Sequence, residues 1–264
     1  MITGKLHGQV AWISGGTKGI GEGTAKLFAK EGASVAIIGR SEKDGNRVVE
    51  EIAQMGGDAI FFKCDVTKAN EVNKSIDLTV EAFGGLQILI NNAGIVDIKE
   101  LHEYTEEEWD WVIDVNVKSM FLAFKYAFPF LKRNQRSYVV NIGSISSFVG
   151  QDNTPVYTTS KGAVLQLSRS IGLDYAKYGI RSNCVCPGIT DTPMLHKHLD
   201  KAPDPDAHLT KRLRRVPLGI ILTPTDVARS ILFFSCEDSA GVTATSLIVD
   251  GGYLAAAEWD CTKC

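Results

Sequence analysis

The sequence predicts a single α/β domain: a doubly wound, mostly parallel, seven-stranded sheet with helices on both faces. Two observations support this fold class. Strand and helix patterns alternate along the 264 residues, and the strand patterns are apolar along their whole length. Continuous apolar runs are typical of parallel strands, because helices cover them on both faces. We expect one domain over residues 1–264, since no repeat or low-complexity linker divides the chain.

The elements follow from periodicity and turn residues. Short apolar runs predict strands at residues 9–14, 34–39, 59–63, 87–91, 138–142, 181–185 and 246–249. Helical patterns cover residues 20–30, 42–55, 69–83, 105–133, 156–177 and 226–235. Thr105 and Glu108 form a capping-box pattern that marks the start of the fourth helix. Residues 193–217 lack clear periodicity and carry four prolines, so we expect an irregular substrate lid there.

Composition limits the possible partners. The chain has 28 basic and 31 acidic residues, which gives no indication of nucleic acid or a membrane surface. The basic cluster at residues 211–215 is most simply a solvated helix face, although it could attract an anionic substrate. The longest apolar segment, residues 119–131, is too short to span a membrane. We expect a cytoplasmic protein, because no secretory signal precedes the first apolar run.

The chain ends in a pair of cysteines with redox or metal-clip spacing, Cys261 and Cys264. Neither a second pair nor a neighbouring histidine accompanies them, so we expect no metal site and interpret residues 254–264 as a tail.

A glycine-rich turn, Ser14-Gly-Gly-Thr-Lys-Gly-Ile-Gly21, joins the first strand to the first helix. Its glycines allow backbone to approach a phosphate closely, and the following helix N-terminus offers unpaired N–H groups and a positive dipole end. A tight turn alone would be a weak signal. Its place in the first strand–helix unit is the context that dinucleotide binding requires, so we predict a dinucleotide site there.

A second motif lies near the start of the 156–177 helix, where Tyr157 and Lys161 stand four residues apart. Positions i and i+4 share one face of a helix. A tyrosine with a pKa of about 10 cannot act as a base near neutral pH, but a fixed positive charge beside it favours the phenolate. Such a pair also occurs by chance on solvated helices, so the surrounding motifs decide its meaning.

Taken in order, these motifs resemble the classical short-chain dehydrogenase/reductase family over about residues 6–253. The residues that carry the resemblance are Gly15, Gly19 and Gly21 in G-x-x-x-G-x-G spacing, Asn91-Asn-Ala-Gly94, Ser144, Tyr157-x-x-x-Lys161, Pro187-Gly188 and Asp250-Gly-Gly252. Ser14 replaces the family's usual threonine and keeps the hydroxyl. The resemblance implies a Rossmann-type domain, a nicotinamide cofactor, hydride transfer to or from a secondary alcohol or ketone, and assembly into dimers or tetramers.

The resemblance also implies roles for individual residues. Tyr157 would give or take the proton, and Lys161 would lower the pKa of the tyrosine and contact the nicotinamide ribose. Ser144 would hydrogen-bond the substrate oxygen, and Asn116 would hold a water that links the lysine to solvent. The expected cofactor contacts are Gly15, Thr17, Lys18, Gly19, Ile20, Gly21, Arg40, Asp65, Val66, Asn92, Ala93, Gly94, Tyr157, Lys161, Pro187, Gly188, Thr190 and Thr192.

The residues after the second strand indicate which cofactor is used. An acidic side chain there would accept hydrogen bonds from the adenosine ribose and repel a 2′-phosphate, whereas a basic one would favour the phosphate. This chain has Gly39 followed by Arg40, and Lys18 in the glycine loop is a second cation. We therefore expect a preference for NADP(H), with NAD(H) as the alternative if both cations are merely solvated.

The substrate is less well indicated. Gln151, Asp152, Asn153, His196 and His198 would suit a sugar, polyol or hydroxy acid. Ile95, Val96, Phe148 and Met194 would equally line an apolar pocket for a steroid or other bulky ketone. A non-catalytic NADP(H)-binding sensor would be expected to lose part of the catalytic set, which is complete here. An enoyl reductase of this fold has its lysine farther from the tyrosine, and the position seven residues on is Val164.

The family's oligomers pair two long helices. The stripe of Phe121, Phe124, Phe128 and Leu131 is compatible with such pairing, and core packing explains it at least as well.

Overall fold

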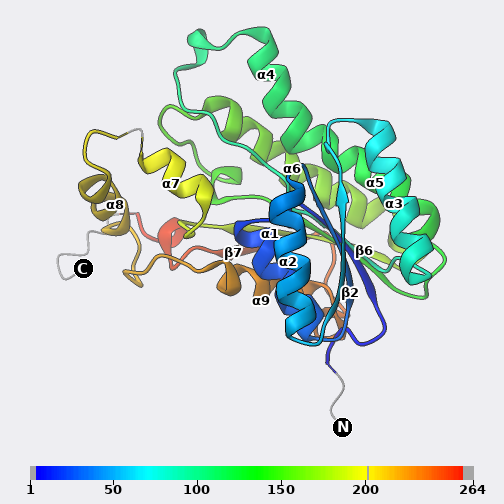
Figure 1. The fold of residues 1–264 in the computed structure, drawn as a ribbon. Coiled ribbons are helices and arrows are strands. Elements are labelled where there is room, and N and C mark those ends of the chain that lie inside the picture. Colours follow the sequence, from blue (N-terminus) through cyan, green and yellow to red (C-terminus); the bar gives the residue numbers. More distant parts are fainter. Residues whose placement is uncertain (1–3, 201, 258–264) are drawn as a thin grey trace.

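In the computed structural model, which describes residues 4–200 and 202–257, seven strands form one sheet (Figure 1). The strands are β1 (Val10–Ser14), β2 (Ser34–Gly39), β3 (Asp58–Lys63), β4 (Ile88–Asn91), β5 (Ser137–Ile142), β6 (Ile180–Pro187) and β7 (Ser246–Val249). Their order is β3-β2-β1-β4-β5-β6-β7, and every neighbouring pair is parallel. The predicted fold class is confirmed.

Helices cover both faces of the sheet (Figure 1). They are α1 (Gly19–Lys30), α2 (Glu42–Gln54), α3 (Ala69–Phe83), α4 (Glu106–Ile113), α5 (Ser119–Leu131), α6 (Pro155–Asp174), α7 (Pro193–Leu199), α8 (Pro205–Leu213) and α9 (Pro224–Phe234). No helix of the described chain is both long and apolar enough to cross a membrane.

Successive side chains of β1 enter two different cores, as the two-residue period of a strand requires. Ala11 and Ile13 pack with α1, α2 and α9, whereas Val10 and Trp12 pack with α3, α5 and α6. Both faces are therefore buried, which explains why the strand reads as a continuous apolar run.

The sequence predicts one helix over residues 105–133, and the structure corrects this. A π-helical turn, Asp114–Lys118, lies between α4 and α5. Within it, the Asn116 side chain accepts a hydrogen bond from Ile95 N (2.8 Å) and donates one to Ile95 O (2.9 Å). These two hydrogen bonds to the loop after β4 stabilise the wider turn. π-Turns in helices are frequent at functional sites.

The prediction of an irregular segment over residues 193–217 is wrong, because α7 and α8 lie there. Each begins with a side-chain cap: Thr192 accepts a hydrogen bond from Leu195 N (3.3 Å), and Asp204 accepts one from Ala207 N (2.9 Å). Pro193 and Pro205 occupy the first helical position, where a missing N–H costs nothing. The prolines start these helices instead of breaking them.

Most of the apolar stripe on α5 belongs to the core. Phe124 and Leu131 are buried, Phe128 is half-buried, and Phe121 is 50% exposed. Core packing therefore accounts for most of the stripe.

We expect Phe28→Ala to lower the free energy of unfolding by about 3–5 kcal/mol, because deleting a buried ring leaves a cavity. Phe28 lies in α1 and is fully buried between the sheet and α9. Urea unfolding followed by circular dichroism measures the change. The matched control is Met55→Ala, whose side chain is 54% exposed and whose effect should stay within about 0.5 kcal/mol. Equal effects of the two substitutions would contradict this assignment of the core.

Candidate active site

A cavity of about 320 Å³ lies at the carboxyl edge of the sheet, where β1 separates the two halves of the fold. Ligands of open α/β sheets bind at this switch point. Most residues that the sequence assigns to the site line this cavity. They are Gly15, Lys18, Gly19, Ile20, Asn92, Ala93, Gly94, Ser144, Tyr157, Lys161, Pro187, Gly188, Thr190 and Thr192.

The other predicted site residues lie outside the cavity lining: Thr17, Gly21, Arg40, Asp65, Val66 and Asn116. Arg40 is exposed and follows β2, and the end of β3 lies beside it because Cys64 N donates to Gly39 O (2.9 Å). Val66 is buried, and Asp65 accepts hydrogen bonds from the backbone and hydroxyl of Thr67. These residues therefore lie along the sheet edge, away from the cavity, and their contact with a cofactor stays a prediction.

The glycine loop has the shape that a phosphate-bearing ligand requires. Gly19 has a φ of +55°, in the left-handed region, and the first turn of α1 has no side-chain cap, so its N–H groups are available. A Cβ on Gly15 would lie 2.9 Å from Asn92 Nδ2, and a Cβ on Gly21 would lie 2.2 Å from Gly15 O. Only glycine fits these positions, and a dinucleotide fits the loop.

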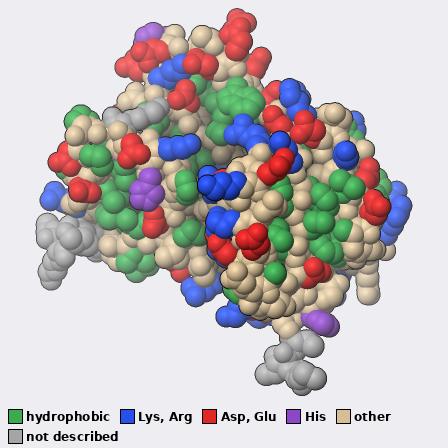
Figure 2. All heavy atoms as spheres, viewed as in Figure 1, with side chains coloured by type: hydrophobic (Ala, Val, Ile, Leu, Met, Phe, Trp, Pro, Cys, Tyr) green, Lys and Arg blue, Asp and Glu red, His purple; other side chains and the backbone are tan. Residues whose placement is uncertain are grey.

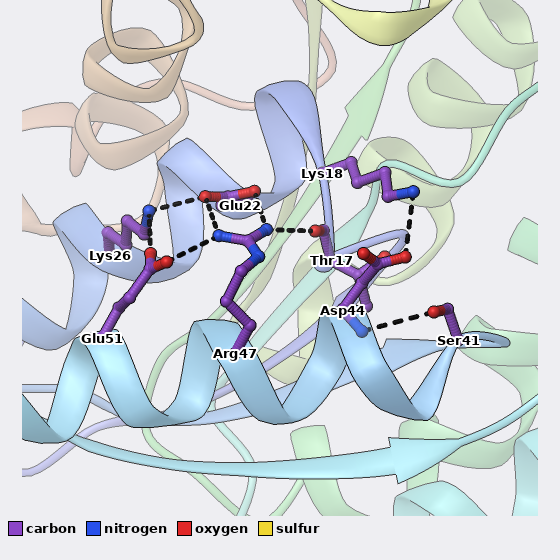
Figure 3. Close-up of polar contacts among 8 residues, drawn as sticks. All are labelled: Thr17, Lys18, Glu22, Lys26, Ser41, Asp44, Arg47 and Glu51. Atoms are coloured by element: carbon purple, nitrogen blue, oxygen red, sulfur yellow. Dashed lines mark hydrogen bonds and ion pairs between the residues drawn. The ribbon is translucent and has the colours of Figure 1, made fainter.

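Charged side chains fasten the glycine loop to α2 (Figure 3). Arg47 of α2 contacts Glu22 of α1 (2.7 Å) and donates a hydrogen bond to Thr17 O (3.2 Å). Burial alone would raise the pKa of Glu22, but hydrogen bonds from Arg47 and Lys26 hold it below its usual value. The network keeps the backbone of the loop in place.

Lys18 of the same loop forms an ion pair with Asp44 (2.9 Å), near the start of α2 (Figure 3). The sequence predicts that Lys18 is a second cation for a phosphate, and in the structure this lysine has a carboxylate partner. More than half of the Lys18 side chain is exposed. Ion pairs between exposed side chains are weak, so this lysine can exchange Asp44 for another anion.

Tyr157 and Lys161 lie one turn apart on α6. Lys161 Nζ is buried, donates a hydrogen bond to Ile142 O (2.7 Å) and lies 5.7 Å from the centre of the Tyr157 ring. Burial raises the pKa of Tyr157, and a hydrogen bond with Ser144 opposes this only in part. Burial also lowers the pKa of Lys161 to about 8. The phenol is therefore protonated near neutral pH, and the lowering of its pKa by Lys161 stays a prediction.

Asn116 reaches the same helix from the π-turn. Its amide donates to the Ser160 hydroxyl (2.9 Å), which in turn donates to Tyr157 O (2.6 Å). A Cβ on Gly94 would lie 3.4 Å from Asn116 Oδ1 and 3.6 Å from Lys161 Nζ. Asn116 therefore positions the first turn of α6, while its role in holding a water stays a prediction.

The substrate side of the cavity combines expected and unexpected residues. Gln151, His198, Val96 and Met194 line it as anticipated. Asp152, Asn153, His196, Ile95 and Phe148 do not, and His196 instead contacts Asp191 (2.7 Å). Sequence reasoning missed Ile145, Thr154, Leu195 and Arg212 as lining residues. Of these four residues, the sequence indicated a role only for Arg212, as part of the basic cluster at residues 211–215 that could attract an anionic substrate.

In residues 4–200 and 202–257, no three His, Cys, Asp or Glu side chains come together as ligands that could hold a metal ion. The Cys261–Cys264 pair lies outside the described residues.

Comparison with known proteins supports the assignment to an oxidoreductase, which the fold and the site suggest. Residues 15–254 match a family model described as enoyl-(acyl carrier protein) reductase. An uncharacterized oxidoreductase of Thermotoga maritima is 40% identical over 250 residues, 95% of this chain and 99% of the relative. Cyclopentanol dehydrogenase of Comamonas testosteroni is 34% identical over 252 residues, 96% and 99% of the two chains. The structure of Thermoplasma acidophilum aldohexose dehydrogenase aligns with a TM-score of 0.87 and 31% identity, covering 98% of each chain.

The parallel sheet, the glycine loop and these relatives define an oxidoreductase of the nicotinamide-cofactor class. Within that class, the chain belongs to the short-chain dehydrogenase/reductase family.

The buried Lys161 predicts a pH-dependent stability. Its pKa is about 8 in the folded chain and 10.5 ordinarily, so below pH 8 both states are protonated and the buried ammonium destabilises the fold. As the pH rises from 8 toward 10.5, the folded state loses this proton first and becomes more stable. Relative to Lys161→Met, the free energy of unfolding of the wild type should rise by about 2 kcal/mol between about pH 7 and pH 9.5.

Urea titrations at several pH values measure this difference, and groups common to both proteins cancel. The exposed-lysine variant Lys74→Met serves as the control and should follow the wild type at every pH. A constant difference between the wild type and Lys161→Met would show that the lysine keeps its ordinary pKa.

Proposed function

We propose that the protein interconverts a secondary alcohol and a ketone with a nicotinamide cofactor. One observation carries the proposal: Ser144, Tyr157 and Lys161 line the same cavity as the glycine loop. When bound, the cofactor would accept or supply the hydride. The alcohol carbon loses that hydride and the alcohol oxygen loses a proton, so the chain must supply a proton acceptor and a hydrogen-bond donor.

The chain's own groups suit these tasks. Tyr157 exchanges the proton with the substrate oxygen, and Ser144, whose side chain hydrogen-bonds the phenol, donates to the same oxygen. Lys161 supplies positive charge from within the core and would hold the nicotinamide ribose. The glycine loop would hold the pyrophosphate, and Asn92, Ala93 and Gly94 would lie beneath the adenosine ribose, with Thr190 and Thr192 on the nicotinamide side.

Reduction of a carbon–carbon double bond, the reaction that the matched family model's description names, is less well supported. Val164, seven residues after Tyr157, is fully buried in the core and offers no charge. The lysine of this site stands at the four-residue spacing, next to the tyrosine.

For the substrate, we propose a polar hydroxylated molecule: a sugar, a polyol or a hydroxy acid. The cavity that contains Tyr157 also presents Gln151 and His198, and polar groups in a site favour substrates that can hydrogen-bond to them. Two similar proteins are named for hydroxylated compounds, cyclopentanol dehydrogenase and aldohexose dehydrogenase. A steroid or other bulky apolar ketone is the second candidate, favoured by Val96 and Met194 in the lining.

For the cofactor, we propose a preference for NADP(H) over NAD(H). Arg40 at the end of β2 is exposed, and none of the described residues forms an ion pair with it. Lys18 can leave Asp44 for a phosphate, since that ion pair is exposed. Together they would hold a 2′-phosphate.

We also propose that copies of the chain assemble through α4 and α5 in the cytoplasm, as a dimer or tetramer. Trp109, Trp111 and Phe121 on these helices are 36–50% exposed, an apolar surface that a second copy would cover.

Replacing Tyr157 with phenylalanine removes the proton donor and leaves the ring. We expect Tyr157→Phe to lower kcat by about 10²–10⁴-fold, the usual contribution of general acid–base catalysis, and to leave cofactor affinity unchanged. Absorbance at 340 nm with a panel of sugars, polyols, hydroxy acids and steroids measures turnover, and fluorescence titration measures cofactor binding. Tyr178→Phe, at an exposed tyrosine after α6, is the control. Near-normal turnover by Tyr157→Phe would remove the tyrosine from this role.

Replacing Arg40 with aspartate reverses the charge at the end of β2. We expect Arg40→Asp to shift the ratio of kcat/KM for NADP(H) over NAD(H) toward NAD(H) by at least about tenfold, since the carboxylate repels a 2′-phosphate and accepts ribose hydrogen bonds. Lys43→Asp makes the same charge change at an exposed position three residues on and should leave the ratio within about threefold. An unchanged ratio in Arg40→Asp means that the cofactor assignment is wrong.

A further inference from the structure

Helix α8 brings one arginine into the cavity. Of the basic cluster at residues 211–215, only Arg212 lines the cavity that contains Tyr157. Arg215 packs 5.0 Å over the Tyr253 ring, and Lys211 and Arg214 are exposed. The cluster is thus not a uniform solvated face, because one of its four charges faces the reacting groups.

The residues around this arginine make the cavity positively charged. Its lining contains Lys18, Lys161 and Arg212, and no aspartate or glutamate of the described chain lines it. Figure 2 shows this face of the molecule, with lysine and arginine side chains gathered around a hollow. Lys161 donates a hydrogen bond to Ile142 O, and Lys18 forms an ion pair with Asp44.

Arg212 differs from these lysines, because no described residue makes a hydrogen bond or ion pair with its guanidinium. The side chain is half-buried, and burial lowers its pKa, yet a guanidinium stays charged throughout the range in which proteins fold. A partly buried charge without a partner costs free energy. An anion that enters the cavity would recover that cost.

Arg212 is also near enough to the Tyr157 phenol to act on it. Burial dominates the pKa of Tyr157 and raises it, and the positive charge of Arg212 acts in the opposite direction. Because both residues line one cavity, a molecule that contacts the guanidinium and the phenol would carry an anionic group as well as its reacting oxygen.

We propose that Arg212 binds a carboxylate of the substrate, so that the preferred substrates are hydroxy acids and their oxo acids. The planar fork of a guanidinium matches the two oxygens of a carboxylate, and one guanidinium neutralises one negative charge. This inference rests on the proposed function and narrows its substrate from polar alcohols in general to anionic ones. It assigns Arg212 to specificity and leaves the proton transfer to Tyr157.

The test compares acids with their neutral esters. Wild type and Arg212→Gln are assayed at 340 nm with reduced cofactor and a series of straight-chain oxo acids, from 2-oxobutanoate to 5-oxohexanoate, each beside its methyl ester. For at least one chain length the wild type should prefer the acid by at least about tenfold in kcat/KM, the range of a charge-assisted hydrogen bond. Arg212→Gln should lose about 10- to 100-fold on that acid and less than about threefold on the ester.

Two further variants separate charge at this position from charge in general. Arg212→Lys keeps the charge without the fork and should retain part of the preference for the acid. Arg214→Gln removes a neighbouring charge that faces solvent and should leave both substrates within about threefold of the wild type. An equal effect of Arg212→Gln on acid and ester, with the esters still reduced, overturns the inference while the proposed function stands.

If the wild type reduces neither acids nor esters, calorimetry decides the inference, and the wider panel of sugars, polyols and steroids decides the proposed function separately. Each oxo acid is titrated into cofactor-loaded wild type and Arg212→Gln. At least tenfold weaker binding to the variant supports the carboxylate site, about the loss expected for one charged hydrogen bond. Equal affinity for the two proteins, or no binding to either, overturns it.

Discussion

The arrangement of the site depends on a set of hydrogen bonds between the ends of β1 and β4. Ser14 Oγ donates to Ile90 O (3.3 Å) and accepts from Asn92 N (3.0 Å) and Ala93 N (3.1 Å). The Asn92 amide returns a bond to Gly15 O (3.1 Å). Because β1 is the strand at which the chain order reverses, these bonds set the distance between the glycine loop and the second half of the fold. A serine meets this need as well as a threonine, since only the hydroxyl takes part.

The parallel pairing of the strands places the other site residues at the same edge of the sheet. β5 pairs with β4 and β6 pairs with β5, so Ser144 and Pro187 emerge at the same edge as Gly15. α6 then crosses back and buries Lys161 against the end of β5. The buried ammonium costs stability, and its hydrogen bond to Ile142 O recovers only part of that cost. A cation buried this deeply is held in a fixed position by the surrounding fold. Transition-state stabilisation requires charges that are fixed in this way.

Much of this could be predicted from the sequence, because parallel strands and glycine loops leave local signals. The strands after which the site residues stand are continuous apolar runs, and their carboxyl ends must share one edge. The features that could not be predicted depend on contacts between distant residues. The π-turn exists because Asn116 bonds to Ile95, 21 residues earlier. Likewise, the packing of α8 decides which arginine of the cluster faces the cavity: Arg212 lines it, whereas Arg215 packs over Tyr253.

α7 and α8 pack separately from the sheet. Leu195 and Leu199 of α7 form a small apolar cluster with Ile189 and Val216, against which α8 packs, distinct from the two cores that flank the sheet. Met194 and His198 lie on α7 and Arg212 lies on α8, beside that cluster, whereas Tyr157 and Lys161 lie on α6. Under the function proposed above, the groups that transfer the proton would be held against the sheet, and the groups that select the substrate would be held by a smaller cluster apart from it.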